Sequence, residues 1–194
     1  MNARSFSSVS FRIASLILAL ILGPGRAPAD SAAGTDLDRA TIDRWAEPFR
    51  GWHYWPGYVI PARPRIPGHE DFHSTDCPCV FQLPGQPERW FMSFIAFNGQ
   101  GYNSFVAEST NLVQWTQPRL AMGFGPTNEF DHGGCVIGAF LYDSYDLRAA
   151  RRLQKRDGRF WTLYGCYPRQ GGYELRPGYE GVAVSDVGLV WRRA

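Results

Sequence analysis

Two aspartates, Asp76 and Asp131, hold equivalent positions in the chain, since each stands shortly before a cysteine–valine pair that opens an apolar segment. Carboxylates that share one cleft can divide the roles of general acid and general base, because repulsion and burial move their pKa values apart. Cleavage of a glycosidic bond uses such a pair. We therefore predict that both are catalytic. The alternative is that both accept backbone hydrogen bonds in turns, as aspartates often do.

The segments that follow these aspartates form an internal repeat. Residues Val106, Ala107, Ser109 and Trp115 recur 76 positions later as Val182, Ala183, Ser185 and Trp191. Upstream, the run 90–97 corresponds to 160–167 at a smaller offset, which predicts an insertion in the second unit between about 142 and 159. Self-similarity of this kind is typical of architectures that stack one structural unit.

Each unit is expected to hold four short apolar segments, which in the first unit are 79–83, 90–97, 104–109 and 113–116. The 21 glycines and 14 prolines among 194 residues, with 15% aromatic residues, favour a turn-rich all-β protein. Because 90–97 is almost continuously apolar, we expect a strand covered on both faces, as in the blades of a β-propeller. A β-sandwich is the alternative, but a sandwich needs no repeated unit.

Two blades cannot close a ring, because they leave sheet edges open and an apolar face uncovered. We therefore predict a partial propeller over 69–194, with blade one at about 69–118 and blade two at about 119–194. The remaining blades are expected from a longer chain or from assembly. A lead-in at 30–68 precedes them, with a short helix capped by Thr35 and a proline-rich segment.

The first 29 residues have the layout of a secretory signal peptide. Arg4 and Arg12 precede the apolar run 13–23, and the small-residue triplet 27–29 follows. That run of about a dozen residues is shorter than the roughly 20 that a spanning helix needs, although an uncleaved anchor is the alternative. We predict cleavage after Ala29, a secreted or periplasmic protein, and no stable membrane insertion after cleavage.

The formal charge of the whole chain is +2, from 20 basic and 18 acidic side chains. The predicted signal peptide contains three arginines and no acidic residue, so the remainder has 17 basic and 18 acidic side chains and a charge of −1. A basic surface is the electrostatic footprint of proteins that bind nucleic acid. We therefore expect no nucleic-acid partner.

The four cysteines are candidates for disulfides, and they and the nearby histidines are candidates for metal ligands. In an oxidising compartment Cys77, Cys79, Cys135 and Cys166 allow one or two disulfides in three pairings, or they are buried apolar residues without a bridge. The spacing of Cys77 and Cys79 does not match a zinc knuckle, and the histidines have no recognised ligand spacing. We predict no metal site and no cofactor.

Two segments, 98–104 and 171–176, join glycine to tyrosine and to amide or charged side chains. A tyrosine ring stacks on a sugar, while amides, imidazoles and guanidinium groups bind its hydroxyls. The predicted sugar-binding residues are His73, Asn98, Tyr102, Asn103, His132, Tyr173 and Arg176. The alternative is that the glycine-rich segments only form turns.

Residues 75–81 and 89–94, together with the later pattern 106–109, Leu112 and Trp115, resemble the first blade of five-bladed glycoside hydrolases of families 43 and 32. The resemblance covers about 69–194. It implies a five-bladed propeller of which about two blades are present, and a carbohydrate substrate.

By that resemblance, Asp76 stands where the family has its catalytic base or nucleophile, and Asp131 stands where an aspartate orients substrate and tunes the acid. The chain departs from the families in two places. Cys77 separates Asp76 from Pro78, and Asp131 is followed by His132, Gly133 and Gly134, which does not match the Arg-Asp-Pro triplet of family 32. The families' general acid, a glutamate on a later blade, has no counterpart here.

These observations predict a secreted, glycoside hydrolase-like protein that hydrolyses glycosidic bonds of poly- or oligosaccharides with paired carboxylates. Because the acid is missing, we expect the chain to be an incomplete enzyme. The alternatives are a noncatalytic carbohydrate-binding propeller and a structural interaction module.

Overall fold

The computed structural model describes residues 38–47, 50, 55–146, 149–172 and 177–194. The chain divides into two compact units, 1–52 and 53–194. The predicted signal peptide lies outside the described residues, and no helix among those described is long and apolar enough to cross a membrane.

The described part of the first unit holds one helix, α2 (Arg39–Ala46). The Asp38 side chain accepts a hydrogen bond from the Thr41 backbone N–H at 2.6 Å. Asp38 is therefore the N-cap, and the prediction that Thr35 caps the helix is wrong.

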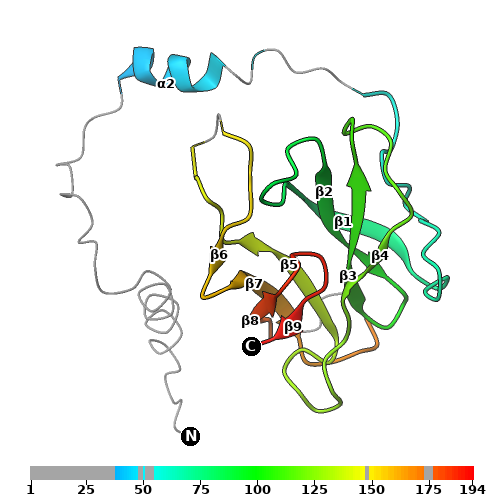
Figure 1. Cartoon of the computed structure of the whole chain (residues 1–194). Coiled ribbons are helices and arrows are strands. Elements are labelled where there is room, and N and C mark those ends of the chain that lie inside the picture. Colours follow the sequence, from blue (N-terminus) through cyan, green and yellow to red (C-terminus); the bar gives the residue numbers. More distant parts are fainter. Residues whose placement is uncertain (1–37, 48–49, 51–54, 147–148, 173–176) are drawn as a thin grey trace, which may run out of the picture. The chain divides into compact units, whose positions relative to one another are not determined.

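The second unit is built from strands, which confirms the all-β prediction (Figure 1). The first four are β1 (His73–Phe81), β2 (Trp90–Phe97), β3 (Tyr102–Ser109) and β4 (Arg119–Met122), each antiparallel to the next. The second group is β5 (Gly134–Phe140), β7 (Arg159–Tyr167), β8 (Tyr179–Ser185) and β9 (Arg192–Arg193), paired in the same way. The short strand β6 (Lys155–Arg156) pairs with β7 inside the predicted insertion. A parallel bridge between Tyr102 and Gly134 joins the two groups.

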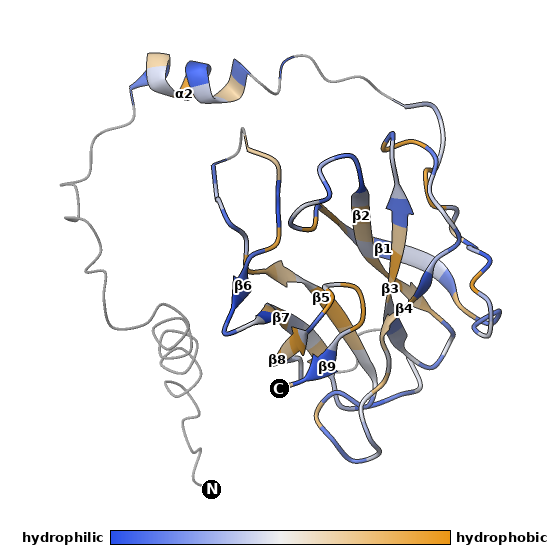
Figure 2. Cartoon of the chain, viewed as in Figure 1, coloured by the Kyte–Doolittle hydropathy of each residue, from blue (hydrophilic) through white to orange (hydrophobic). Residues whose placement is uncertain are grey.

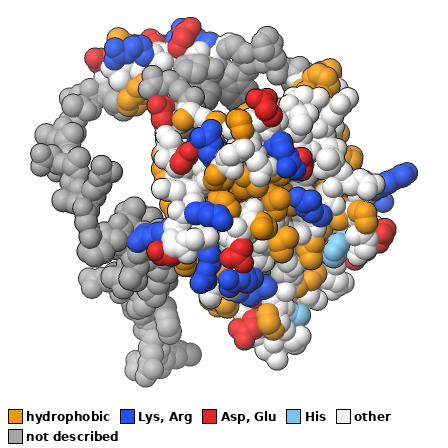
Figure 3. Space-filling view, viewed as in Figure 1, with side chains coloured by type: hydrophobic (Ala, Val, Ile, Leu, Met, Phe, Trp, Pro, Cys, Tyr) orange, Lys and Arg blue, Asp and Glu red, His pale blue; other side chains and the backbone are white. Residues whose placement is uncertain are grey.

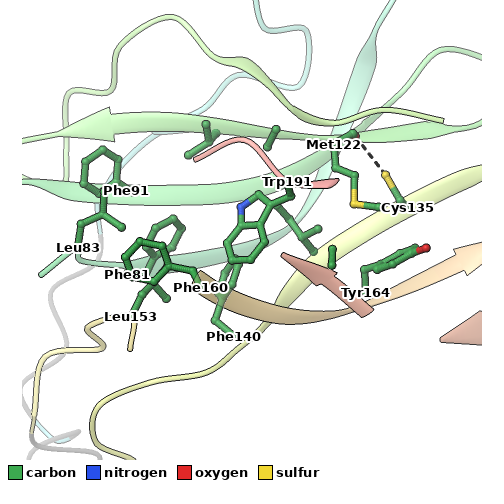
Figure 4. Packing of buried hydrophobic residues seen from close by; sticks show 14 of the residues in the cluster. Phe81, Leu83, Phe91, Met122, Cys135, Phe140, Leu153, Phe160, Tyr164 and Trp191 are labelled. Carbon is green, nitrogen blue, oxygen red and sulfur yellow. Dashed lines mark hydrogen bonds between the residues drawn. The ribbon is translucent and has the colours of Figure 1, made fainter. Parts of the chain in front are cut away.

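The two groups of strands pack together through one apolar cluster, which Figure 4 shows from close by. Phe81 and Phe91 from the first group meet Phe140, Phe160 and Trp191 from the second. In Figure 2 strand β5 is largely hydrophobic, whereas the short strands β6 and β9 are hydrophilic. The two β groups therefore form one continuous core.

A second apolar cluster lies on the other face of the first group and includes Phe94 and Phe105. Ile66 of the lead-in and Phe72, which directly precedes β1, cover this face, and both are buried. Residues 91–96 of β2 are all buried as a result. The prediction of a strand covered on both faces is confirmed.

The repeat extends to the hydrogen bonds of the turns. The Ser109 hydroxyl accepts hydrogen bonds from the N–H groups two and three residues later, and Ser185 does the same. The third residue of each turn, Leu112 or Gly188, has a positive φ. The prediction of a strand over 113–116 is wrong, because the Asn111 side chain accepts hydrogen bonds from the N–H groups of 113 and 114, and strand β4 begins only at Arg119.

We expect Gly188→Ala to lower the free energy of unfolding by about 1–3 kcal/mol. Gly188 has a φ of +80°, and a Cβ there would approach Leu83 Cδ2 to 2.5 Å. Leu112→Ala, at the equivalent exposed position, is the matched control and should change stability by less than about 0.5 kcal/mol. Urea denaturation measures both, and equally small effects would show that the turn tolerates a side chain.

The four cysteines are thiols in the structure, and two of them, Cys135 and Cys166, are buried as the alternative without a bridge expected. Cys135 and Cys166 lie opposite each other on β5 and β7 and are buried, whereas Cys77 is exposed. Burial raises the pKa of both buried thiols to about 12.

We expect Cys77 to react with iodoacetamide at pH 8 at least about a hundredfold faster than Cys135 or Cys166, because the thiolate is the reactive form. The pKa of Cys135 and of Cys166 is also higher in the folded than in the unfolded chain. The protonated buried thiols therefore stabilise the folded state below about pH 9. That contribution is lost as the pH rises toward 12. Peptide mass spectrometry of a timed reaction gives the rates, and similar rates at all three sites would contradict the burial.

Candidate functional site

The backbone around Asp76 is irregular although it lies within β1. The pairing with β2 shifts register between His73 and Asp76, and again between Asp76 and Cys79. Ser74 and Cys77 have φ values of 51° and 53°, a region that non-glycine residues adopt at a cost of about 1–3 kcal/mol each. The Cys77 N–H donates to Asp76 Oδ1 at 2.7 Å. Bulges re-aim side chains and strained residues cluster at functional sites, so this segment is the strongest candidate among the residues that the structure describes.

Pro78 lines two hollows, which otherwise share no lining residue. The smaller, of about 280 Å³, contains Asp76 and Thr75 from β1, with the lead-in residues from Gly57 to Ile60 on its border. We call it the Asp76 hollow. The larger, of about 590 Å³, extends from Cys77 over β5, β7 and the start of β8, and we call it the tyrosine hollow.

The tyrosine hollow is named for Tyr102, Tyr167 and Tyr179, which line it together with Glu180. The rings of Tyr102 and Tyr167 meet edge to face with centroids 6.0 Å apart. Gly165 lies within β7, and a Cβ there would meet nothing within 4 Å. The hollow therefore combines aromatic rings, one carboxylate and an open glycine floor, which suits a polar ring-shaped ligand.

Asp131 is only 1% exposed, and its contacts are with protein groups. The Tyr164 hydroxyl donates to Asp131 Oδ2 at 2.9 Å, and Arg193 Nε donates to the same oxygen. Arg193 also donates to the Gly123 carbonyl at 2.9 Å. The pKa of Tyr164 is raised well above its ordinary value. Burial is the largest cause, and the hydrogen bond to Asp131 is the second. The carboxylate thus ties the loop before β5 to β7 and β9.

Three predicted sugar-binding residues are held by neighbouring protein groups. His73 packs edge to face on Phe97, and its Nδ1 lies 2.9 Å from the Ser74 hydroxyl. The Asn98 side chain accepts two backbone hydrogen bonds at 3.0 Å within its turn, as the alternative interpretation of this segment expected. His132 Nδ1 lies 3.1 Å from the Gly125 carbonyl.

Asn103 is 4% exposed, and its Oδ1 has no hydrogen-bond partner among the described residues. Tyr173 and Arg176 lie outside the described part of the chain. The structure thus places Asp76 in one hollow and Tyr102, which is only 1% exposed, in the wall of another, while His73 lines a third, of about 630 Å³, beside the lead-in. None of these three hollows is lined by Asp131, Asn98, Asn103 or His132.

Sequence reasoning missed several residues of the hollows, namely Tyr58, Tyr167, Tyr179 and Glu180. Tyr167 ends β7, and Tyr179 and Glu180 begin β8. Nothing in the sequence distinguishes these positions from the ends of other strands. Within the described ranges, no three histidine, cysteine or acidic side chains are grouped closely enough to hold a metal ion. On the face in Figure 3, basic side chains alternate with acidic and apolar ones.

No protein-family model and no curated protein matches the sequence. Solved structures share its fold, among them two that align with most of this chain. One is a glycoside hydrolase with 21% identity and a TM-score of 0.60, matched over 81% of this chain and 44% of its own. The other is BT0996 in an RGII complex, with 22% identity and a TM-score of 0.58, over 78% and 44%. The chain spans less than half the length of these structures, and its fold is glycoside hydrolase-like.

Proposed function

We propose that this chain supplies the first two blades of a secreted, five-bladed propeller that hydrolyses glycosidic bonds, with Asp76 as the catalytic base or nucleophile. The observation that carries the proposal is the doubly bulged start of β1, which presents Asp76 in one hollow and Cys77 at the border of a second hollow lined by tyrosines. The glycoside hydrolase-like fold supports the reaction class.

In this proposal the Asp76 carboxylate removes a proton from water or attacks the anomeric carbon directly. The separation from the acid decides which, since about 5–5.5 Å allows direct attack and about 6.5–9.5 Å leaves room for a water molecule. The proton donor comes from a further blade. Asp131 acts indirectly, by holding the loop that leads into β5.

The remaining blades would cover the face of the second group that points away from the core. Along β7, fully buried residues alternate with half-buried ones, which include Trp161, Leu163 and Tyr167. A sheet that is buried on one face and half-buried and apolar on the other is suited to packing against another sheet. The matched structures are more than twice as long as the aligned part of this chain, which is consistent with further blades.

Calorimetry and sugar release by the full-length protein test the proposal. Oligosaccharides derived from RGII are the first substrates to examine, because one structure of the same fold is an RGII complex. Binding with release of sugar supports the enzyme, and binding without release supports a noncatalytic carbohydrate-binding propeller. Absence of binding to a broad oligosaccharide panel would overturn both.

A further inference from the structure

The lead-in is fixed to the first group of strands. Val59 and Ile60 pack against the second apolar cluster, and Ile66 is 1% exposed. The Thr75 hydroxyl donates to the Pro61 carbonyl at 3.5 Å, which links the lead-in to β1 beside Asp76. A segment anchored at several points holds its intervening and adjacent side chains in defined places.

Tyr58 stands directly before these anchors, and its side chain is 86% exposed. The neighbouring Gly57 has a φ of +148°. The chain therefore bends at a glycine, which adopts this backbone conformation readily because it has no Cβ. A large aromatic side chain that is left exposed on an anchored segment does not contribute to the core. The same residue lines the Asp76 hollow together with the proposed catalytic residue.

The chemistry of the Asp76 hollow suits a sugar ring. Met92, Phe94 and Pro78 supply apolar surface, while Thr75 and Asp76 supply a hydroxyl and a carboxylate. Sugars present both apolar ring faces and hydroxyl groups, which tyrosine and carboxylate side chains recognise. At about 280 Å³ the hollow is at the lower limit of ligand pockets, which are about 300–1,000 Å³. That volume holds a single sugar ring and leaves no room within the hollow for an extended chain.

We propose that Tyr58 is the platform on which one terminal sugar ring stacks, in contact with Asp76, so that the protein releases monosaccharides from chain ends. The inference rests on the proposed function. It assigns substrate binding to the lead-in, which covers the first group of strands and also completes the subsite. A stacking contact that is equal in the ground state and the transition state changes KM and leaves kcat unchanged.

Steady-state kinetics of the full-length protein test this role. Tyr58→Ala should raise KM about tenfold with kcat changed less than about twofold, since stacking in an exposed subsite has an effect of this order. Tyr58→Phe, which keeps the ring, should retain a KM near that of the wild type. Tyr145→Ala, which removes an exposed tyrosine outside the three hollows, is the matched control and should leave KM unchanged. Thermal unfolding of Tyr58→Ala should match the wild type.

The outcomes separate the inference from the proposed function. An unchanged KM in Tyr58→Ala, or oligosaccharides as the first products, overturns the subsite while loss of activity in Asp76→Asn still supports the enzyme. Full activity in Asp76→Asn overturns the proposed function itself. A raised KM in Tyr58→Ala, with monosaccharide as the product, supports both.

Discussion

Asp131→Ala should lower the free energy of unfolding by about 2–4 kcal/mol. The substitution leaves the Tyr164 hydroxyl and Arg193 Nε without their common acceptor. Tyr164 is 1% exposed and cannot turn to water, whereas the Arg193 side chain is 34% exposed and is partly rehydrated, which limits the loss. Urea denaturation of the purified variant measures the change.

A matched control separates this network from ordinary surface pairs. Asp143 pairs with Arg152 at 3.4 Å, and both side chains are more than a third exposed. Asp143→Ala should therefore cost less than about 1 kcal/mol. Asp131→Asn keeps the shape but loses the charge, so its effect should fall between the two. If Asp131→Ala and Asp143→Ala were equally mild, the carboxylate would not hold the loop before β5.

Asp76→Asn should lower kcat of the full-length protein by at least about a thousandfold, because the amide can neither accept a proton from water nor attack the anomeric carbon. Asp76 is exposed, so the variant should unfold at the wild-type temperature. Substrate binding should persist, because the Asp76 hollow retains Thr75 and its apolar lining. Steady-state kinetics and calorimetry measure the two properties.

The control for this experiment is Asp157→Asn, which removes a carboxylate at an exposed turn between β6 and β7. Its kcat should stay within about twofold of the wild type. A comparable loss in both variants would indicate a general effect of charge, and the role of Asp76 would have to be abandoned.

Much of the fold was predictable because its determinants are local. Strand β2 has the predicted bounds of 90–97, since an uninterrupted apolar run between two turns leaves few alternatives. The repeated serine and tryptophan also mark equivalent turns, where Ser109 and Ser185 accept the same pair of backbone hydrogen bonds. Such short-range patterns are visible in any one sequence.

The elements that were mispredicted depend on side-chain bonds that compete with strand pairing. Val113 to Thr116 are apolar enough for a strand, but the Asn111 side chain captures the backbone N–H groups that a strand would use. The helix cap differs for a similar reason, since Asp38 lies nearer to the first turn than Thr35. A prediction based on the apolar pattern alone does not take these side-chain hydrogen bonds into account.

The candidate site was only partly predictable because it joins distant segments. Asp131 meets Arg193 across 62 positions, and no local pattern marks that partner. Tyr58 belongs to an irregular lead-in without periodicity, so its place beside Asp76 emerges only from the packing of Val59 and Ile60. The catalytic roles predicted for Asp76 and Asp131 remain predictions, of which the proposed function keeps that of Asp76 and gives Asp131 the indirect role of holding the loop before β5.

Release of sugar by the wild-type protein and by Asp76→Asn, measured side by side on an oligosaccharide panel that includes RGII fragments, tests the central claim most directly. We predict discrete sugar products above the buffer background with the wild type, and background levels with Asp76→Asn at equal substrate binding. Wild-type protein that binds but releases nothing, or an Asp76→Asn variant that releases sugar at the wild-type rate, would contradict the assignment of Asp76 as the group that cleaves glycosidic bonds.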